Sequence, residues 1–227
     1  MRVLAIDTAL EACAAAVLDT ASGAVAAHES LPMLRGHAEA LMPLIKRVME
    51  RAGLNFAELD RVAVTTGPGS FTGLRVGIAA ARGLALAAGK PAVGLSTLAA
   101  FAAPLIAQDD TLPVAAAIDA RHGQVYLQVF GPGGRTVVAP RIFSLREALR
   151  AAAVGTPRLT GTAATVLAAA WPKGERPPSK VDQRGAPDID WVARLGAAAD
   201  DKAAPPKPLY LRAPDAQPQN ASQLARR

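Results

Sequence analysis

Short apolar runs alternate with longer stretches of helical periodicity along the first half of the chain. Apolar residues spaced three and four positions apart predict helices at 36–53 and 72–88, and Ser96 is expected to cap a third helix that ends near residue 106. Apolar runs bounded by turn residues predict strands at 2–7, 14–18, 24–29, 62–64 and 92–95. A meander followed by strand–helix–strand units predicts an α/β fold.

The second half of the chain begins with a pattern similar to the first. An apolar strand ends in Ile6-Asp7 and a second strand returns, and the same happens around Ile118-Asp119. This repetition predicts an internal duplication. Later elements are less regular, with a strand at 125–130, helices at 145–153, 163–170 and 191–199, and proline-rich extended segments at 172–187 and 205–218. We expect two related domains, 1–108 and 109–213, followed by a disordered tail at 214–227.

A glycine-proline loop separates the fourth expected strand from the second expected helix. Pro68 fixes its own φ, while Gly67 and Gly69 allow backbone angles that a Cβ would forbid, so the chain can reverse within a few residues. Ser70 or Thr72 is placed to cap the helix. The loop is either a plain tight turn or an anion site, because N–H groups and the helix dipole point to one place. It lacks the lysine of a P-loop, which argues against a Walker-type NTPase.

Two aspartates mark equivalent strand ends, and both are expected to face a cleft between the domains. Asp7 and Asp119 would there hold a metal-bound nucleotide; the alternative is that each caps its own turn, because neither hairpin has a glycine-rich turn. No two of the three histidines show the i, i+4 spacing of metal ligands on one helix, so we predict no metal site. The candidate vestigial nucleotide or anion site comprises Asp7, Thr8, Gly67, Gly69, Ser70, Thr72 and Asp119.

Both predicted helices of the first domain carry a surface suited either to the core or to a partner. The helix at 72–88 contains Gly73, Gly77 and Gly83, and each glycine costs about 1 kcal/mol of helix propensity against alanine. That cost is easier to understand if another backbone packs closely there. The candidate docking residues on the two helices are Leu41, Leu44, Ile45, Val48, Gly73, Val76, Gly77, Ala80 and Ala81.

Composition and charge narrow the class of protein. The chain has 227 residues, 51% of them hydrophobic but only 4% aromatic, so Ala, Val and Leu must form a closely packed core. The single cysteine, Cys13, excludes an internal disulfide framework and a zinc knot. No signal-peptide pattern or long uncharged apolar run is found, so we expect a cytoplasmic protein with no membrane association. The net charge of +6 permits an RNA partner, but the scattered basic residues predict no sequence-reading RNA surface.

Four motifs in a fixed order resemble one family. They are Leu4-Ala5-Ile6-Asp7-Thr8 with Glu11-Ala12-Cys13, the loop and helix start at 67–77, the strand end at 117–121, and Leu209-Tyr210-Leu211-Arg212. Together they resemble the TsaB (YeaZ) family of bacterial tRNA threonylcarbamoyladenosine biosynthesis proteins, from residue 1 to about 213. The loop is also similar to that of the paralogue TsaD, but this chain lacks the His-x-x-x-His metal pair of that family. Residues 163–187 match nothing in the family pattern.

The resemblance implies an actin-like fold of the sugar kinase/Hsp70 superfamily. It also implies a non-catalytic subunit with no cofactor, which dimerises with a TsaD homologue through the helices at 36–53 and 72–88 and works with a TsaE-type ATPase. That complex transfers a threonylcarbamoyl group to the N6 amine of the adenosine beside the anticodon, in tRNAs that read A-starting codons. The tRNA is reached through the complex, and a homodimer is expected when the chain is alone. A small-molecule kinase of the same fold, and a metalloprotease after an older family label, are the alternatives.

Overall fold

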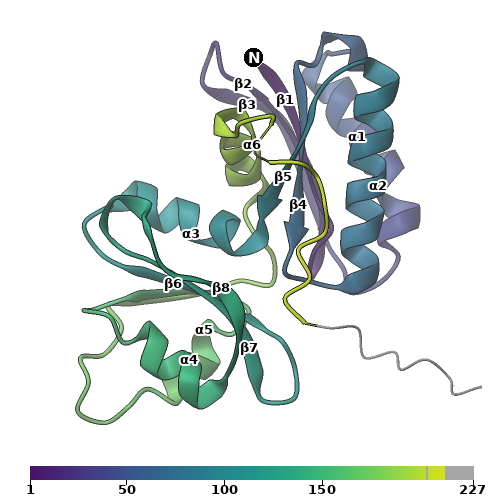
Figure 1. Cartoon of the computed structure of the whole chain (residues 1–227). Helices are drawn as coiled ribbons and strands as arrows, with labels where there is room; N and C mark the ends of the chain where they lie inside the picture. The colour runs from purple at the N-terminus through teal and green to yellow at the C-terminus, as the bar shows by residue number, and fades with distance from the viewer. Residues whose placement is uncertain (203, 213–227) are drawn as a thin grey trace, which may run out of the picture.

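The computed structural model describes residues 1–202 and 204–212, which form two α/β halves, each built on a five-stranded sheet (Figure 1). In the first sheet, β1 pairs with β2 and β2 with β3 in antiparallel directions, while β4 lies parallel to β1 and β5 parallel to β4. The spatial order is β3-β2-β1-β4-β5. The strands are β1 (Arg2–Asp7), β2 (Ala12–Asp19), β3 (Ala24–Pro32), β4 (Arg61–Gly67) and β5 (Ala92–Ser96).

The second sheet repeats this topology strand for strand. Its order is β8-β7-β6-β9-β10, with an antiparallel meander on one side of β6 and two parallel strands on the other. The strands are β6 (Val114–Asp119), β7 (Gln124–Phe130), β8 (Thr136–Ser144), β9 (Arg158–Gly161) and β10 (Lys180–Gln183). The predicted α/β class is confirmed, and the repeated topology supports the inferred duplication and is the arrangement expected of an actin-like fold.

The helices occupy equivalent places in the two halves. One helix follows the meander, one joins the two parallel strands, and one follows the last strand. The first half has α1 (His37–Ala52), α2 (Phe71–Ala88) and α3 (Thr97–Gln108), and the second has α4 (Leu145–Ala152), α5 (Ala164–Ala169) and α6 (Ile189–Ala198). Short 3-10 turns occur at Phe56–Glu58 and Pro132–Gly134.

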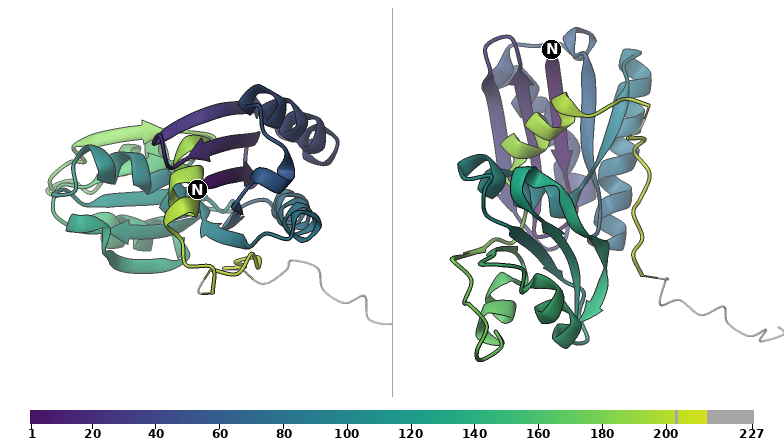
Figure 2. Two further views of the ribbon diagram at one scale, coloured as in Figure 1. Left: turned by 90° about the horizontal axis from the view of Figure 1, so that it is seen from above. Right: turned by 60° about the vertical axis from the view of Figure 1, so that its left-hand side comes forward.

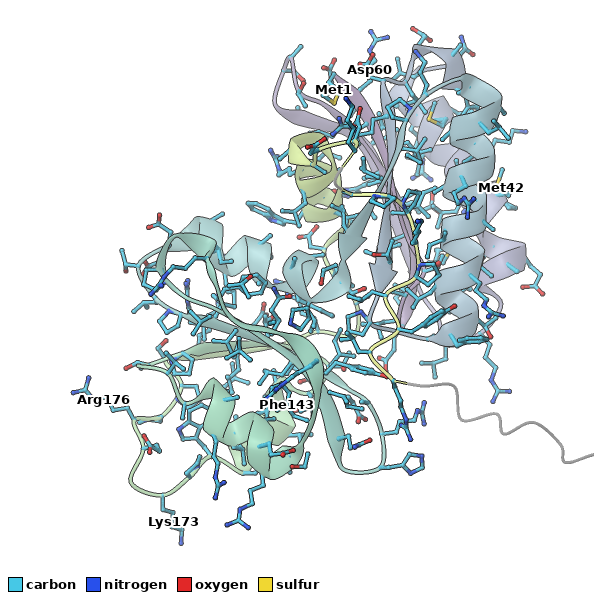
Figure 3. All side chains as sticks on the ribbon, viewed as in Figure 1. Met1, Met42, Asp60, Phe143, Lys173 and Arg176 are labelled. Atoms are coloured by element: carbon cyan, nitrogen blue, oxygen red, sulfur yellow. The ribbon has the colours of Figure 1, made fainter. Side chains whose placement is uncertain are left out.

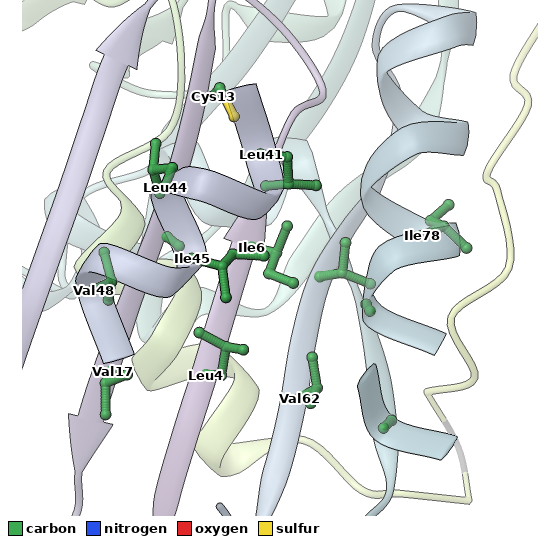
Figure 4. Close-up of a cluster of buried hydrophobic side chains, with 14 of the residues drawn as sticks. Leu4, Ile6, Cys13, Val17, Leu41, Leu44, Ile45, Val48, Val62 and Ile78 are labelled. Carbon is green, nitrogen blue, oxygen red and sulfur yellow. The ribbon is translucent and has the colours of Figure 1, made fainter. Parts of the chain in front are cut away.

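The main core of the first half lies between its sheet and the helix pair α1 and α2 (Figure 4). Alternate residues of β1, such as Leu4 and Ile6, face this helix layer and are fully buried. Their neighbours Val3 and Ala5 face the opposite side of the sheet, because successive side chains of a strand alternate. The first sheet therefore needs a second cover on its other face.

The last helix of each half supplies cover for the sheet of the other half. Ile189, Val192 and Ala193 of α6 pack against the Val3 and Ala5 face of the first sheet. In return α3, which follows β5, packs against β6 and β7 of the second sheet, whose opposite face is covered by α4 and α5. Figure 2 shows α6, in yellow-green, lying across the strands of the first half. The predicted boundary at residue 108 stays a prediction, but packing does not divide there.

After α6 the chain returns along the first half as an extended segment, residues 204–212, which we call the strap (Figures 1 and 2). Gly94 of β5 donates its N–H to the carbonyl of Ala204 at 2.8 Å, and Leu209 donates its N–H to the carbonyl of Thr66 at 2.8 Å. Arg212 then donates to the carbonyl of Ala120 in the second half at 3.2 Å. The strap thus joins the glycine-proline loop to the second half.

Most predicted elements are found, with two corrections. The sequence predicted neither β9 nor β10: each has only four residues, and β10 lies inside the segment expected to be extended and proline-rich. α6 begins at Ile189, two residues before the expected start, because the side chain of Asp188 accepts from the N–H of Asp190. The tail expected to be disordered, 214–227, lies outside the described residues.

Candidate functional site

A cleft of about 690 Å³ separates the two halves where the carboxyl ends of β1 and β6 meet. Its lining combines loops from both halves with the start of α2 and the end of the strap. The polar lining residues are Glu11, Ser70, Asp119, Arg121, Thr162, Gln183 and Arg212, and the apolar ones include Leu10, Leu34, Phe71 and Tyr126. This is the position at which the aspartate pair was expected.

Asp7 lies beneath the cleft rather than in its lining, and no part of its side chain is exposed. Its Oδ1 accepts from the hydroxyl of Thr65 and, at 3.2 Å, from the N–H of Ala9, while Oδ2 has no partner among the described residues. Burial raises its pKa from 3.8 to about 6, against the opposing effects of the Thr65 and Ala9 hydrogen bonds and the charge of His37. A carboxyl group so enclosed is poorly placed to hold a nucleotide-bound metal.

Asp119, by contrast, lines the cleft and is exposed to solvent. Its Oδ1 accepts from the N–H of Arg121 at 2.7 Å, and its own N–H donates to Thr162 Oγ1 at 2.9 Å. Asp7 makes the same bond to the N–H two residues further on, at Ala9. Each aspartate therefore caps its own turn, which is the alternative left open by the sequence, and only Asp119 is available to a ligand in the cleft.

The glycine-proline loop packs against the turn that follows β1. The N–H of Ser70 donates to the carbonyl of Ala9 at 2.7 Å, and a Cβ on Gly69 would collide with that same carbonyl. Ser70 caps α2 by accepting from the N–H of Gly73 at 3.3 Å, and Thr72 is exposed in the first turn. Gly67 has a φ of 123° and faces the carbonyl of Leu209 in the strap. These contacts account for the glycines without an anion, so the anion site stays a prediction.

The predicted docking residues must be divided into buried and accessible ones. Most of them are buried against the first sheet or the β1–β2 turn. These residues already form the core beneath the helices and cannot contact a partner. They are Leu41, Leu44, Ile45, Val48, Gly73, Gly77 and Ala81. Val76 and Ala80 are partly buried. The outward faces of α1 and α2 carry other residues, which the list of candidate docking residues did not include: Met42, Phe71, Ala79, Gly83, Leu86 and Ala87, together with the charged residues Glu39, Lys46, Glu50, Arg75 and Arg82.

The outward face of α2 is apolar except for the exposed side chains of Thr72, Arg75 and Arg82. Leu86 is 84% exposed and Met42, on the neighbouring α1, is 48% exposed. Met42 is labelled in Figure 3. Within the described residues, α2 is also the one helix long and apolar enough to cross a membrane by length and composition, although only 33% of its residues are buried. One such helix is weak support for a membrane span, and its inner face packs on the first sheet. An apolar helix left mostly uncovered is a typical feature of a docking surface.

The strap adds an aromatic and cationic group at the beginning of α2. The rings of Phe71 and Tyr210 lie 5.5 Å apart between centroids, and the guanidinium of Arg75 lies 3.7 Å from the centre of the Phe71 ring. Arg75 Nε also donates to the Tyr210 hydroxyl at 3.3 Å. The motif at 209–212 thus lies beside α2 and, through Arg212, reaches the cleft.

Within residues 1–202 and 204–212, no three His, Cys, Asp or Glu side chains lie close enough together to hold a metal ion. Cys13 is buried, and burial raises its pKa to about 11. The small-molecule kinase and metalloprotease alternatives remain untested hypotheses.

Comparison with known proteins identifies the family. A family model described as TsaD, tRNA N6-adenosine threonylcarbamoyltransferase, matches residues 32–176, which is more than half of the chain. The chain belongs to this family. Among its relatives, the tRNA threonylcarbamoyladenosine biosynthesis protein TsaB of Escherichia coli is 43% identical over 126 residues, which cover 56% of this chain and 53% of that protein. The predicted resemblance to TsaB (YeaZ) is thereby confirmed.

Longer matches extend the similarity over nearly the whole chain. An uncharacterised protein of Mycobacterium tuberculosis is 36% identical over 217 residues, covering 95% of this chain and 94% of that one. The structure of YeaZ from Pseudomonas aeruginosa matches with a TM-score of 0.74 and 27% identity, over 92% of this chain and 99% of that chain. The named TsaB relatives from E. coli and Haemophilus influenzae are matched over only about half of their length, 53% and 52%.

Proposed function

We propose that this chain is a non-catalytic subunit of a complex that forms threonylcarbamoyladenosine in tRNA. In this proposal it docks on a TsaD homologue and works with a TsaE-type ATPase. The complex transfers the threonylcarbamoyl group to the N6 amine of the adenosine beside the anticodon. Family membership supports the pathway, since E. coli TsaB is named for this biosynthesis.

One observation carries the proposed mode of action: the outward face of α2 is largely apolar, and Leu86 on it is left open to solvent by the rest of the described chain. Leu86 projects almost completely into solvent, and Gly83 and Ala79 lie one and two turns before it on the same side of the helix. Burying a leucine side chain on association contributes about 1.5–3 kcal/mol, so Leu86 is a natural anchor for a second helix. Small residues beside it let the partner's backbone approach. The docking surface that we propose therefore consists of the outward, not the inward, faces of α1 and α2.

Substitution of Leu86 by glutamate tests the docking surface. A buried unpaired carboxylate is strongly unfavourable, so Leu86→Glu should weaken binding to the TsaD homologue of the same organism at least tenfold, or about 1.4 kcal/mol. Val166→Glu is the matched control, because Val166 is a 50% exposed apolar residue on α5 in the second half. Affinities would be measured by titration calorimetry on the purified full-length proteins. Equal binding by wild type and Leu86→Glu would contradict the proposed surface.

The biological role has a separate test. Deletion of the gene in its own organism should abolish the modified nucleoside in bulk tRNA, as measured by mass spectrometry of nucleosides, and wild-type protein should restore it. Val166→Glu should restore it as well, whereas Leu86→Glu should not. Intact modification in the deletion strain would refute the proposed function whatever the binding experiment shows.

A further inference from the structure

Cationic side chains that stand apart in the sequence gather on the outer side of the second half. Arg146 and Arg150 are exposed on successive turns of α4. Helix geometry places their Cβ atoms about 5–6 Å apart. Both line a cavity of about 430 Å³ whose other wall includes Pro172 and Glu175, which places the loop 172–176 beside α4.

Three further cations lie on the two elements next to α4, the 172–176 loop and β8. Lys173 and Arg176 project from the 172–176 loop away from the body of the protein (Figure 3). Arg141 on β8 lies over the ring of Phe143 with its guanidinium 4.3 Å from the ring centre. We call Arg141, Arg146, Arg150, Lys173 and Arg176 together the α4 surface.

Direct ion pairs do not hold these cations within the part of the chain that the structure describes. None of the five forms an ion pair with another described residue, whereas in the first half Arg47 and Arg51 both bind Glu29. Two acids lie nearby, Glu147 and Glu175. Glu147 is committed to the cap of α4, since it accepts from the N–H of Ser144 at 2.9 Å and from its hydroxyl at 2.7 Å. Those hydrogen bonds are the main reason that the pKa of Glu147 is lowered, and the nearby charges of Arg141 and Arg150 lower it further.

The form of the surface favours phosphate groups over other anionic partners. Phe143 is only 5% exposed beneath Arg141, so its ring does not supply the large apolar anchor that protein interfaces and membrane-bound helices use. Exposed arginine and lysine side chains with free N–H groups are what a nucleic-acid backbone binds, without any reading of sequence. We infer that the α4 surface contacts the phosphate backbone of RNA while the first half holds the protein partner. This inference rests on the proposed function, which supplies tRNA as the substrate.

The placement of the two surfaces allows both contacts at once. α4 lies at the far end of the second half, while α1 and α2 lie on the outer side of the first half (Figure 1). A partner on α2 therefore leaves the α4 surface uncovered. Since the chain has a net charge of +6, a general attraction to RNA must be separated from a local one.

The test replaces four charges at once, with a control that removes the same number elsewhere. The variant Arg146→Gln/Arg150→Gln/Lys173→Gln/Arg176→Gln is compared with Lys90→Gln/Arg194→Gln/Lys202→Gln/Lys207→Gln. Each is combined with the TsaD homologue, and affinity for an unmodified tRNA transcript is measured at several salt concentrations. Counterion release of about 0.7–0.9 per phosphate contact predicts that the α4 variant lowers the slope of log K against log salt by about 3, and weakens binding at least tenfold at low salt. The control should change the slope by less than about 1.

Docking is measured first, on the same preparations without RNA, and circular dichroism checks that each variant is folded. Equal salt slopes for wild type and the α4 variant would overturn the RNA surface, as would an equal loss in the control variant. Loss of docking to the TsaD homologue in the α4 variant alone would also overturn it, since the surface would then be a protein interface. If the wild-type chain itself does not dock, the proposed function fails, and the RNA titration is then read on the full-length chain alone with the same criteria.

Discussion

Thr8 determines how closely α2 approaches the first sheet. Its side chain is buried, and its hydroxyl donates to the carbonyl of Gly73 at 2.7 Å. A Cβ on Gly77 would collide with the same hydroxyl oxygen, and a Cβ on Gly73 would collide with the carbonyl of Thr8. The close neighbour that explains both glycines is therefore Thr8 of the chain itself, by its backbone carbonyl at Gly73 and by its side-chain hydroxyl at Gly77. Docking of a partner, the function predicted for them from the sequence, is not needed to account for them.

Alanine substitutions in α2 separate the two kinds of glycine. Gly77→Ala should destabilise the protein by about 1–3 kcal/mol, because the collision with Thr8 outweighs a gain in helix propensity of about 1 kcal/mol. Gly83→Ala should instead stabilise it by about 0.5–1 kcal/mol, since no atom lies within 4 Å of the added Cβ. Urea unfolding followed by circular dichroism measures both. A stabilising Gly77→Ala would show that Thr8 can move away at little cost.

The buried carboxyl of Asp7 should make stability depend on pH. Its pKa rises from 3.8 to about 6 on folding, so the folded state holds the proton more tightly than the unfolded state. The resulting stabilisation is complete below about pH 4 and is lost as the pH rises through about 6. The Asp7→Asn variant has no carboxyl to titrate. Its free energy of unfolding, relative to wild type, should therefore rise by about 2 kcal/mol between pH 4.5 and pH 7.5.

Denaturant unfolding of both proteins at a series of pH values measures this difference. Taking the difference between the two proteins removes the contributions of all other titrating groups that the substitution leaves unchanged. Parallel curves for wild type and Asp7→Asn would contradict the explanation by burial.

At the scale of the elements, α3 and α6, the helices that each cover the sheet of the other half, are held by equivalent arginines. Arg61 begins β4, and its Nη1 donates to three carbonyls at the end of α6, those of Gly196, Ala197 and Ala199. Arg158 begins β9, the equivalent strand, and its guanidinium donates to the carbonyls of Leu105, Asp109 and Leu112 around the end of α3. Both arginines are more than nine-tenths buried. The duplication is thus visible in these equivalent hydrogen bonds as well as in the topology.

Replacement of Arg61 should release the end of α6. Arg61→Met leaves the helix carbonyls without their donor, and we expect a loss of about 2–4 kcal/mol in the free energy of unfolding. Arg61→Lys should recover less than half of that loss, because an ammonium group cannot reproduce the planar fork of donors. Arg2→Met removes an exposed ion pair with Glu58 and is the control, with an expected change below about 1 kcal/mol.

Hydrogen exchange shows whether this effect is local. Amide protons of α6 should lose protection in Arg61→Met to a greater extent than those of α1, which Arg61 does not contact. Uniform loss of protection in both helices would show that the arginine stabilises the whole protein rather than the crossing helix.

Local signals explain which elements the sequence predicted well. α2 is bounded by Ser70, whose side chain caps it, and by Gly89, whose φ of 64° ends it, and both residue types are strong local signals. β9 and β10 carry no such signal, because four-residue strands are too short to show periodicity and owe their pairing to neighbours distant in sequence. The contact between Gly77 and Thr8 could not be predicted either, since the two residues are far apart along the chain.

At the scale of the whole molecule, the cleft and the strap could not be predicted from local sequence patterns either. The sequence correctly placed Asp7 and Asp119 at equivalent strand ends, but it could not show that one is enclosed and the other exposed. The motif Leu209-Tyr210-Leu211-Arg212 indicated the family, but the sequence did not show what this motif does in the structure. Its contacts to Thr66, Phe71 and Ala120 depend on how the chain returns after α6. Such long-range contacts follow from the fold and not from neighbouring residues.

The exchange of helices means that neither half is complete by itself. Without α6, the face of the first sheet formed by Val3, Ala5, Ala14 and neighbouring apolar residues would lie open to water. A fragment of residues 1–108, the predicted first domain, should therefore bind a hydrophobic dye and unfold without a cooperative transition. The same fragment joined by a flexible glycine-serine linker to residues 186–212 should unfold cooperatively and bind little dye, because α6 and the strap restore the missing cover.

The comparison isolates the contribution of residues 186–212. In both fragments α3 lacks the second sheet against which it packs, so that loss is the same in the two. A point variant sharpens the comparison: Val192→Asp in the linked fragment places a charge in the buried face of α6 and should return it to the behaviour of residues 1–108 alone. Cooperative unfolding of the unlinked fragment would mean that α6 is not needed to complete the first half. It would also support residue 108 as a true domain boundary, and the interlocking of the halves would then serve their relative placement instead of their stability.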